Sequence, residues 1–297
     1  MIEVIVPVFH QHQVEYFISK SGRNFCVSTP FLASGLEHTT QVTDLKPIVD
    51  CVKKENAQLG LLINRLILES EFMHFEKEVA NILAIFTPDY FIVSDVGVMF
   101  YLNETYKIPV YFHSDTTIAN AKDGAVILEH GASMIMPARE LTLKKKLALI
   151  ESLPNQIMIP LFGYQVMSKS YRPLLTNYLD EIKVSAPIKN KLFYFKESKR
   201  EEYYLGFEDA HGFSMYTHAI MDLITEKPQL EAAGLKYGWL DPSFIEDELI
   251  GAVIMYFHDR INIAQMLEVI HQYDKQHIFN KGLHYRDTSL TKEQVNE

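Results

Sequence analysis

Short apolar runs alternate with segments of helical periodicity through the first 180 residues. The runs are rich in Ile and Val and have the length of buried strands, at 4–9, 61–68, 90–93, 110–112, 133–136 and 157–162. Between several of them, apolar residues recur at spacings of three and four, which predicts helices at 42–56, 72–86, 118–130 and 143–151. Strand and helix alternate at about 25 residues per unit, so the pattern predicts an α/β protein built on a parallel sheet.

The first strand is not followed by G-x-G-x-x-G or by G-x-x-x-x-G-K-[ST], the loops typical of dinucleotide and nucleotide sites. An open doubly wound sheet therefore becomes the weaker alternative. The favoured fold is a (β/α)8 barrel of the TIM type.

The alternation changes after about residue 180. Two strand-like pieces at 191–195 and 203–207 and the turn-like sequence EDAHGF predict a small antiparallel insertion over 186–217. Helix and strand then return, with helical patterns at 219–233, 245–257 and 263–273 and a strand at 236–240. We expect one barrel-like domain over 1–273, followed by a polar C-terminal tail over 274–297.

Composition narrows the function. The 297 residues are 47% hydrophobic, which disfavours disorder, and contain two cysteines, too few for a disulfide scaffold or a four-cysteine cluster. The net charge of −10 argues against DNA binding and against RNA binding by this chain alone. No apolar run is long enough to span a membrane, and MIEVIVPVF predicts a first strand rather than a signal peptide. We expect a cytoplasmic protein with no membrane contact.

Active sites of parallel barrels lie at the C-terminal ends of the strands. Polar residues at predicted strand ends or in the predicted turn are therefore candidates: Asn64, Arg65, Ser94, Asp95, His113, Ser114, Asp115, Arg139, Glu140, Tyr164, Asp209, His211 and Asp241. Of these, we select Asn64, Asp95, His113, Arg139, Glu140, Asp209 and His211 as candidates for substrate binding. Asp95 could instead be a helix N-cap, Glu140 could favour the start of the next helix, and Arg139 could simply pair with a carboxylate.

Evidence for catalysis is weak. His10-x-His12 and His113-x-Asp115 have ligand-like spacing but no evident third ligand, so we predict no metal site. The chain has no G-x-S-x-G motif and no cysteine beside a His-rich segment, which leaves catalytic residues unassigned. The basic and aromatic stretch at 189–200 could contact RNA or form an ordinary solvated strand face.

Five segments together resemble the collagenase-like peptidase family U-32. In family order they are YFIVSDVGVMFYL (90–102), HSDTTIAN (113–120), GASMIMPARELTLKK (131–145), FEDAHGFSMYTHAIMDLI (207–224) and LEAAGLKYGWLD (230–241). In GYQVMSKSYRPLL (163–175), Val166 and Pro173 occupy positions where family members carry cysteines for an iron–sulfur cluster. The resemblance therefore implies no cluster in this chain.

Short members of that family often work in pairs. The resemblance implies the smaller, cluster-free subunit of tRNA wobble-uridine 5-hydroxylation, with a cysteine-bearing paralogue that supplies the cluster and the contact with tRNA. It also implies a pocket for a prephenate-like carboxylate, with Asp95 and His113 as hydrogen-bonding groups and Arg139 and Arg172 as anion clamps. The alternatives are a collagenase-like peptidase and a non-catalytic scaffold that binds a small molecule.

Overall fold

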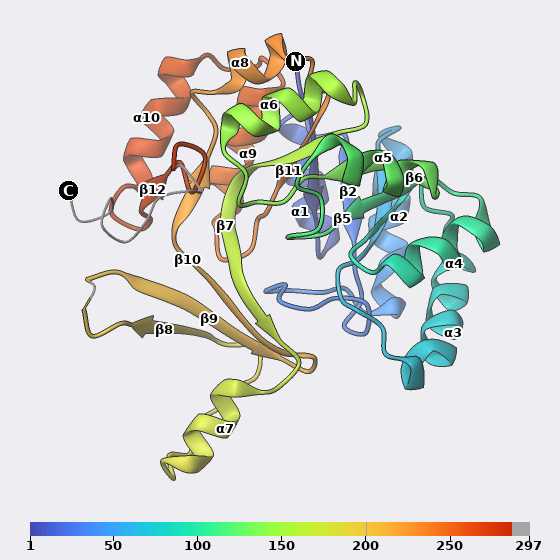
Figure 1. The fold of residues 1–297 in the computed structure, drawn as a ribbon, viewed down its shortest axis with the longest axis vertical. Coiled ribbons are helices and arrows are strands. Elements are labelled where there is room, and N and C mark those ends of the chain that lie inside the picture. The colour runs from blue at the N-terminus through green and yellow to red at the C-terminus, as the bar shows by residue number, and fades with distance from the viewer. Residues whose placement is uncertain (200, 287–297) are drawn as a thin grey trace.

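The computed structural model describes residues 1–199 and 201–286, and its centre is a ring of parallel strands (Figure 1). The eight strands of the ring are β1 (Glu3–Pro7), β2 (Asn24–Val27), β3 (Gln58–Ile63), β4 (Phe91–Val93), β5 (Val110–His113), β6 (Ala132–Met136), β7 (Met158–Ser170) and β11 (Tyr237–Leu240). Neighbours run from β1 to β6 in chain order, and β11 joins β1 to β7. A parallel bridge between Ile135 and Ile157 links the β6 and β7 sides. The predicted (β/α)8 architecture is confirmed.

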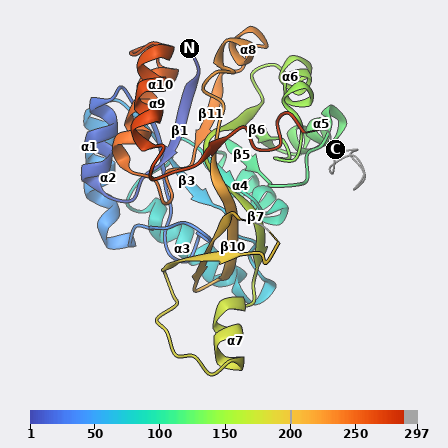
Figure 2. The ribbon, with the colours of Figure 1, turned by 90° about the vertical axis from the view of Figure 1, so that its left-hand side faces the viewer.

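Helices surround the ring (Figure 2). They are α1 (Gln11–Ser19), α2 (Leu45–Lys54), α3 (Phe72–Leu83), α4 (Val96–Tyr106), α5 (Ala121–Glu129), α6 (Leu143–Ser152), α8 (Lys227–Ala232), α9 (Asp247–Phe257) and α10 (Ile263–Tyr273), with 3-10 turns η1 (Val42–Asp44) and η2 (Glu69–Glu71) before α2 and α3. The apolar residues that predicted these helices are the ones that face the core. In α2 the buried face carries Leu45, Ile48, Val49 and Val52. Among these described helices, none is long and apolar enough to cross a membrane.

The strands bury both faces. Alternate residues point into the ring, where Leu62, Ile92, Met134 and Trp239 belong to one apolar cluster. The residues between them point outward and join the larger cluster under the helices, as Leu61 does on β3. This packing on both sides explains why the strands read as continuous apolar runs.

An antiparallel arm projects from the ring, and we define it as residues 166–216 (Figure 1). It contains the outer part of β7, then α7 (Leu174–Glu181), β8 (Leu192–Lys196), β9 (Tyr203–Asp209) and the first part of β10 (Gly212–Asp222). Within the arm, β10 pairs with β7 on one side and β9 on the other, and β8 pairs with β9. The arm starts about twenty residues before the predicted insertion at 186–217, because β7 continues beyond residue 162.

Two predicted boundaries were wrong. The strand predicted at 61–68 is β3, which begins at Gln58 and ends at Ile63. Residues 64–68 leave the sheet, and there Asn64 bonds to Ser34 and Arg65 to the Phe31 carbonyl instead of to strand neighbours. The helix predicted at 219–233 is confined to Lys227–Ala232. Residues 219–222 extend β10 instead, where Ile220 pairs with Tyr164 of β7, so sheet pairing overrides the local helical pattern.

The segment after α10 returns to the barrel. Its strand β12 (Phe279–Asn280) pairs in parallel with β10 at Ile220 and Met221. Residues 274–286 of the predicted polar tail are thus described and packed, while 287–297 lie outside the described residues.

Candidate ligand site at the barrel mouth

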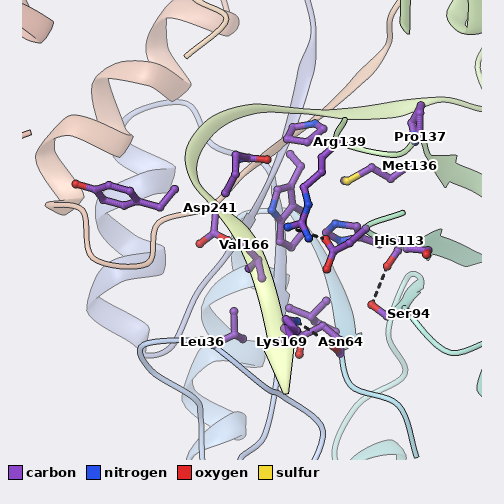
Figure 3. A pocket seen from close by; sticks show the side chains of 17 residues that line it. Leu36, Asn64, Ser94, His113, Met136, Pro137, Arg139, Val166, Lys169 and Asp241 are labelled. Carbon is purple, nitrogen blue, oxygen red and sulfur yellow. Dashed lines mark hydrogen bonds and ion pairs between the residues drawn. The ribbon is translucent and has the colours of Figure 1, made fainter. Parts of the chain in front are cut away.

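A small cavity, which we call the inner chamber, lies at the C-terminal ends of the ring strands (Figure 3). Its volume is about 60 Å³, and its charged or polar lining includes His113, Asp115, Arg139, Lys169 and Asp241. A second cavity of about 260 Å³, the vestibule, shares Asp115 and Lys169 with the chamber. The shared lining means that a ligand could place one end in the chamber and its body in the vestibule.

Arg139 enters the chamber from the loop after β6, and its side chain retains 18% exposure. Its Nη1 lies 3.7 Å from Oδ1 of Asp115, which is an ion pair but longer than a hydrogen bond. The main chain of the same two residues is joined directly, because the Arg139 N–H donates to the Asp115 carbonyl at 3.2 Å. The guanidinium is therefore held near Asp115 but makes no close bidentate contact with it. Bidentate pairing is the geometry in which Arg binds carboxylates most strongly.

His113 supplies a neutral polar group. It ends β5, and its ring packs edge-on against Trp239 at a centroid distance of 5.4 Å. Burial lowers the pKa of His113 to about 4, so the imidazole is uncharged at pH 7. Its Nδ1 is buried without a hydrogen-bond partner among the described residues. Buried polar atoms are normally paired, so this atom is a candidate contact for a ligand.

Lys169 lies on β7, with its side chain still in contact with solvent in the open cleft. Its Nζ lies 3.5 Å from the carbonyl oxygens of Ser34 and Asn64. Protein crowded around the ammonium lowers the pKa of Lys169, an effect that Asp115 opposes and Arg139 reinforces. Figure 3 shows Lys169 and Arg139 approaching the chamber from different sides. Two cations thus face a space large enough for one small anionic group.

The two acids of the chamber differ in electrostatics. Burial raises the pKa of Asp241, against the opposing hydrogen bond from the Ser243 N–H at 3.0 Å. Burial also acts to raise the pKa of Asp115, but Lys169, His113 and Arg139 together lower it below its usual value. The carboxyl group of Asp115 is therefore the one that stays ionised in the chamber. The carboxyl group of Asp241 is protonated more easily.

Gly163 allows β7 to pass close to Asp241. Its φ is +134°, and a Cβ built there would lie 2.7 Å from the Asp241 carbonyl oxygen. Only a residue without a side chain fits this approach and this backbone conformation. The glycine therefore has a structural reason to stand where β7 leaves the ring.

Asn64 and Asp95 have structural partners. The Asn64 side-chain oxygen accepts from the Ser34 N–H at 2.8 Å and its amide donates to the Ser34 carbonyl at 3.1 Å, although Asn64 also lines both cavities. Asp95 caps α4 through the Val98 N–H at 3.1 Å and accepts from the Ile67 N–H with its other oxygen. Asp95 lines neither the chamber nor the vestibule. The capping alternative accounts for both of its oxygens.

Asp209 and His211 lie in the β9–β10 turn and attach the arm to the mouth. The two oxygens of Asp209 accept from the N–H groups of Gly35 and His211, each at 2.7 Å. His211 Nδ1 lies 2.7 Å from Arg65 Nη1, and its Nε2 lies 2.7 Å from the Pro30 carbonyl oxygen. Arg65 cannot accept a proton, so the arginine donates and the imidazole donates to Pro30. His211 also lines the vestibule.

Glu140 and Arg172 lie apart from this group. Both side chains are exposed, and neither lines the chamber or the vestibule. Arg172 follows the outer end of β7, two positions after the strand ends at Ser170. Of the two arginines expected to clamp an anion, the structure places Arg139 alone at the chamber.

The site residue that the sequence did not predict is Lys169. It becomes visible only when β7 is known to extend past Phe162, which places the GYQVMSKS segment along the mouth. Val166, at a position where the resemblance to the family implies a cysteine in other members, also lines the chamber. Asp115 and Asp241 each follow a predicted strand, and this position marks them as candidate site residues in the sequence.

The hydroxyl and thiol groups near the ring that could act as nucleophiles are either hydrogen-bonded within the protein or buried. Ser94 Oγ donates to the His113 carbonyl at 2.7 Å, and Ser114 Oγ lies 2.6 Å from the Thr117 hydroxyl oxygen. Cys26 is buried inside the ring, and burial raises the pKa of its thiol. Within residues 1–199 and 201–286, no three His, Cys, Asp or Glu side chains form a group that could hold a metal. The polar lining of the chamber therefore includes the cations Arg139 and Lys169, the neutral His113 and the carboxyl groups of Asp115 and Asp241.

The closed ring and the polar cavity at its C-terminal end define a (β/α)8-barrel protein with a mouth site. The family model of peptidase family U32 matches residues 35–281, and the chain belongs to this family. No curated protein sequence matches the chain.

Comparison with the solved structure of another U32 protein supports the fold. The structure of the U32 peptidase Mk0906 is similar over 81% of this chain and 92% of its own, with 12% identity and a TM-score of 0.52. A putative dihydrodipicolinate synthetase from Pseudomonas aeruginosa matches over 93% and 82% of the two chains, with 9% identity and a TM-score of 0.45. A chitinase from Chromobacterium violaceum ATCC 12472 matches over 91% and 99%, with 10% identity and a TM-score of 0.43. At 12% identity the likeness to Mk0906 concerns the fold alone.

Proposed function

We propose that this U32 chain is the cluster-free subunit of a tRNA wobble-uridine 5-hydroxylation pair, and that its barrel mouth binds a small carboxylate. The carboxylate is of the prephenate type. A cysteine-bearing paralogue contributes the iron–sulfur cluster and the main contact with tRNA.

The observation that carries the binding proposal is the inner chamber itself. Arg139 and Lys169 approach it from different sides, and the neutral His113 lines it as well. A carboxylate there would accept from the guanidinium and the ammonium, and it would compete with the 3.7 Å contact between Arg139 and Asp115. Arg139 is mostly shielded from solvent, with 18% of its side chain exposed, so its charge-assisted contact is worth more than it would be in open water.

The sizes of the two cavities support a ligand with a small charged end. At about 60 Å³ the chamber accommodates a group such as a carboxylate, while the vestibule of about 260 Å³ accommodates a larger body. Tyr171 lines the vestibule, and its hydroxyl donates to the Leu66 carbonyl at 3.0 Å, which fixes the ring at the rim. A cyclic carboxylate fits this division of space.

The proposal of a paired subunit rests on two things that this chain lacks: cysteines that could hold a cluster at the mouth, and a net positive charge that would favour RNA binding. Val166 lines the chamber and Pro173 precedes α7, so the family's two cysteine positions in this segment hold no thiol. Cys26 is buried within the ring, and Cys51 is on α2, away from the mouth cavities. The net charge of −10 also favours an RNA contact made mainly by a partner.

Mass spectrometry of tRNA nucleosides from cells that lack this gene tests the proposal. We expect 5-hydroxyuridine derivatives at the wobble position to be lost or reduced, and wild-type protein to restore them. Arg139→Ala should fail to restore them, while Arg172→Ala, which changes an exposed arginine outside both cavities, should succeed.

An unchanged nucleoside profile, also in a double deletion that removes any redundant pathway, would contradict the proposed pathway. Equal restoration by Arg139→Ala and wild type would contradict the role of the chamber. Purification of the tagged chain adds an independent test, since a cysteine-bearing U32 paralogue should copurify with it.

A further inference from the structure

A buried lysine lies behind the arginine of the chamber. Lys146 on α6 has no exposed surface, and its Nζ donates to the Arg139 carbonyl at 3.2 Å. The same Nζ lies 3.0 Å from Nε2 of His284. Both contacts join the ammonium to uncharged acceptors. Burying a cation in this way is costly, and an apolar side chain would fill the space at less cost, so the hydrogen bonds themselves need an explanation.

His284 is arranged to accept from this lysine. Its Nδ1 lies 2.8 Å from the Lys281 carbonyl oxygen, so Nδ1 carries the proton and Nε2 is free to accept. Burial lowers the pKa of His284 to about 4, which keeps the ring neutral at pH 7. The His284 carbonyl also accepts from the Leu143 N–H at 2.9 Å, at the first residue of α6. His284 therefore holds both the side chain of Lys146 and the start of its helix.

His284 belongs to a segment that is itself anchored, which we call the C-terminal clasp (residues 277–286). Lys281 donates to Asp222 at 2.8 Å and to Glu226 at 2.9 Å, near the end of β10 and the start of α8. At the other end of the clasp, His277 Nδ1 lies 2.9 Å from the Tyr164 hydroxyl on β7. The clasp thus connects β7, β10 and α6 behind the mouth.

The main chain of Arg139 is held on both sides. Its N–H donates to the Asp115 carbonyl, and its own carbonyl accepts from Lys146. One contact comes from the chamber side and the other, through Lys146, from the clasp. With the backbone fixed at both groups, fewer positions remain for the guanidinium, and less entropy is lost when an anion binds.

We propose that Lys146 is a positioning residue for Arg139, and that the clasp, by holding Lys146 through His284, sets the affinity of the chamber for its carboxylate. This inference rests on the proposed anion-binding role of Arg139. It adds that a segment distant in sequence, with no residue lining the chamber, controls ligand binding.

Two measurements test the inference, one with ligand and one without. Isothermal titration with prephenate should show affinity about tenfold lower in Lys146→Met, which keeps the apolar stem but removes the donor. Lys144→Met is the matched control, because Lys144 is exposed on the same helix, and its affinity should equal that of wild type. His284→Leu should weaken binding like Lys146→Met, while His284→Gln, whose side-chain oxygen can accept from Lys146, should restore most of the affinity.

A double-mutant cycle separates positioning from general damage. In an Arg139→Ala background, Lys146→Met should have no further effect on the residual affinity. Equal losses in both backgrounds, or wild-type affinity in Lys146→Met with all variants folded by their melting temperatures, would overturn the inference and leave the proposed function intact.

The second measurement needs no ligand. Phenylglyoxal modifies accessible arginines, and peptide mass spectrometry reports the rate at Arg139. We expect that rate to rise several-fold in Lys146→Met and His284→Leu and to stay unchanged in Lys144→Met. If wild type fails to bind prephenate but the Arg139 rate still rises, the positioning role stands and the ligand is wrong. An unchanged rate would contradict the positioning role.

Discussion

The ring and the arm are stabilised in different ways. The ring buries apolar side chains on both faces of its strands, and several charged residues line the inner chamber at its C-terminal end. The arm is attached to the mouth by polar contacts, with Asp209 on the Gly35 N–H and His211 between Arg65 and Pro30. Arg139 therefore directs a charged side chain into a cavity of the ring, and Lys169 reaches the same cavity from the arm's β7, whereas Asp209 in the β9–β10 part of the arm uses its charge to hold the structure together.

Glu208 shows the arm's use of charge most clearly. Its carboxylate is fully buried on β9 and accepts from the Leu175 N–H at 2.8 Å and from the N–H and hydroxyl of Thr176. It therefore satisfies the N-terminus of α7 from a neighbouring strand, where the preceding Pro173 makes no side-chain cap. Arg139, in contrast, has its close contacts through the backbone and directs its side chain into a cavity.

The largest expected effect is at the junction of the two regions. Gly163→Val should cost about 3 kcal/mol or more of unfolding free energy, because it adds a clash with Asp241 to an unfavourable φ. Gly234→Val is the matched control, since Gly234 has a φ of +91° and no atom within 4 Å of the position that a Cβ would occupy. Denaturant unfolding should show a loss of about 1–2 kcal/mol for the control. Equal losses would contradict the close approach of β7 to Asp241.

Because the ammonium of Lys146 is buried, we expect the free energy of unfolding to depend on pH. Burial lowers the pKa of Lys146 from 10.5 to about 8, so between these values the unfolded chain binds more protons than the folded protein. Stability contributed by this group should therefore rise with pH above about 8, by at most about 3 kcal/mol. Denaturation at pH 8 and 9.5 checks this, with Lys146→Met as the comparison that should lose the rise. The same rise in both proteins would contradict the assignment to Lys146.

The arm should lose stability locally when its buried carboxylate is neutralised. Glu208→Gln should cost about 1–3 kcal/mol, because it weakens the contacts with the first amides of α7. Hydrogen exchange should increase across residues 174–181 and stay unchanged in the ring strands. Glu202→Gln is the control, since Glu202 is exposed just before β9. Faster exchange throughout the ring would show that the arm and the ring unfold together.

The smallest effect is expected at a mouth residue that is structural. Asp95→Ala should cost about 0.5–2 kcal/mol through loss of the α4 N-cap, with carboxylate binding retained. Thermal unfolding and titration of the same sample measure the two quantities. A loss of binding in a folded Asp95→Ala protein would return Asp95 to the ligand site.

The sequence predicted seven of the eight ring strands, because each of the seven contains a short apolar run buried on both sides, but it did not predict β2 (Asn24–Val27). It predicted the extent of the arm poorly, because residues 163–170 mix glycine, polar and charged side chains although β7 continues through them. The contacts that attach the arm join residues far apart, such as Asp209 and Gly35, 174 positions apart, and local periodicity carries no information about them.

The site residues on the ring could also be predicted from the sequence, whereas the site residue on the arm could not. His113 and Arg139 were predicted from their positions at strand ends, which the parallel ring brings together at one mouth. Lys169 was missed because its strand was expected to end earlier. Arg172 was predicted from the resemblance to the family, but the structure places it outside both cavities.

Titration of prephenate into wild type, Arg139→Ala and Arg172→Ala tests the central claim that the inner chamber is the carboxylate site. We expect that wild type binds, that Arg139→Ala binds at least about tenfold more weakly, and that Arg172→Ala binds like wild type. Wild-type affinity in Arg139→Ala, or a loss confined to Arg172→Ala, would contradict it.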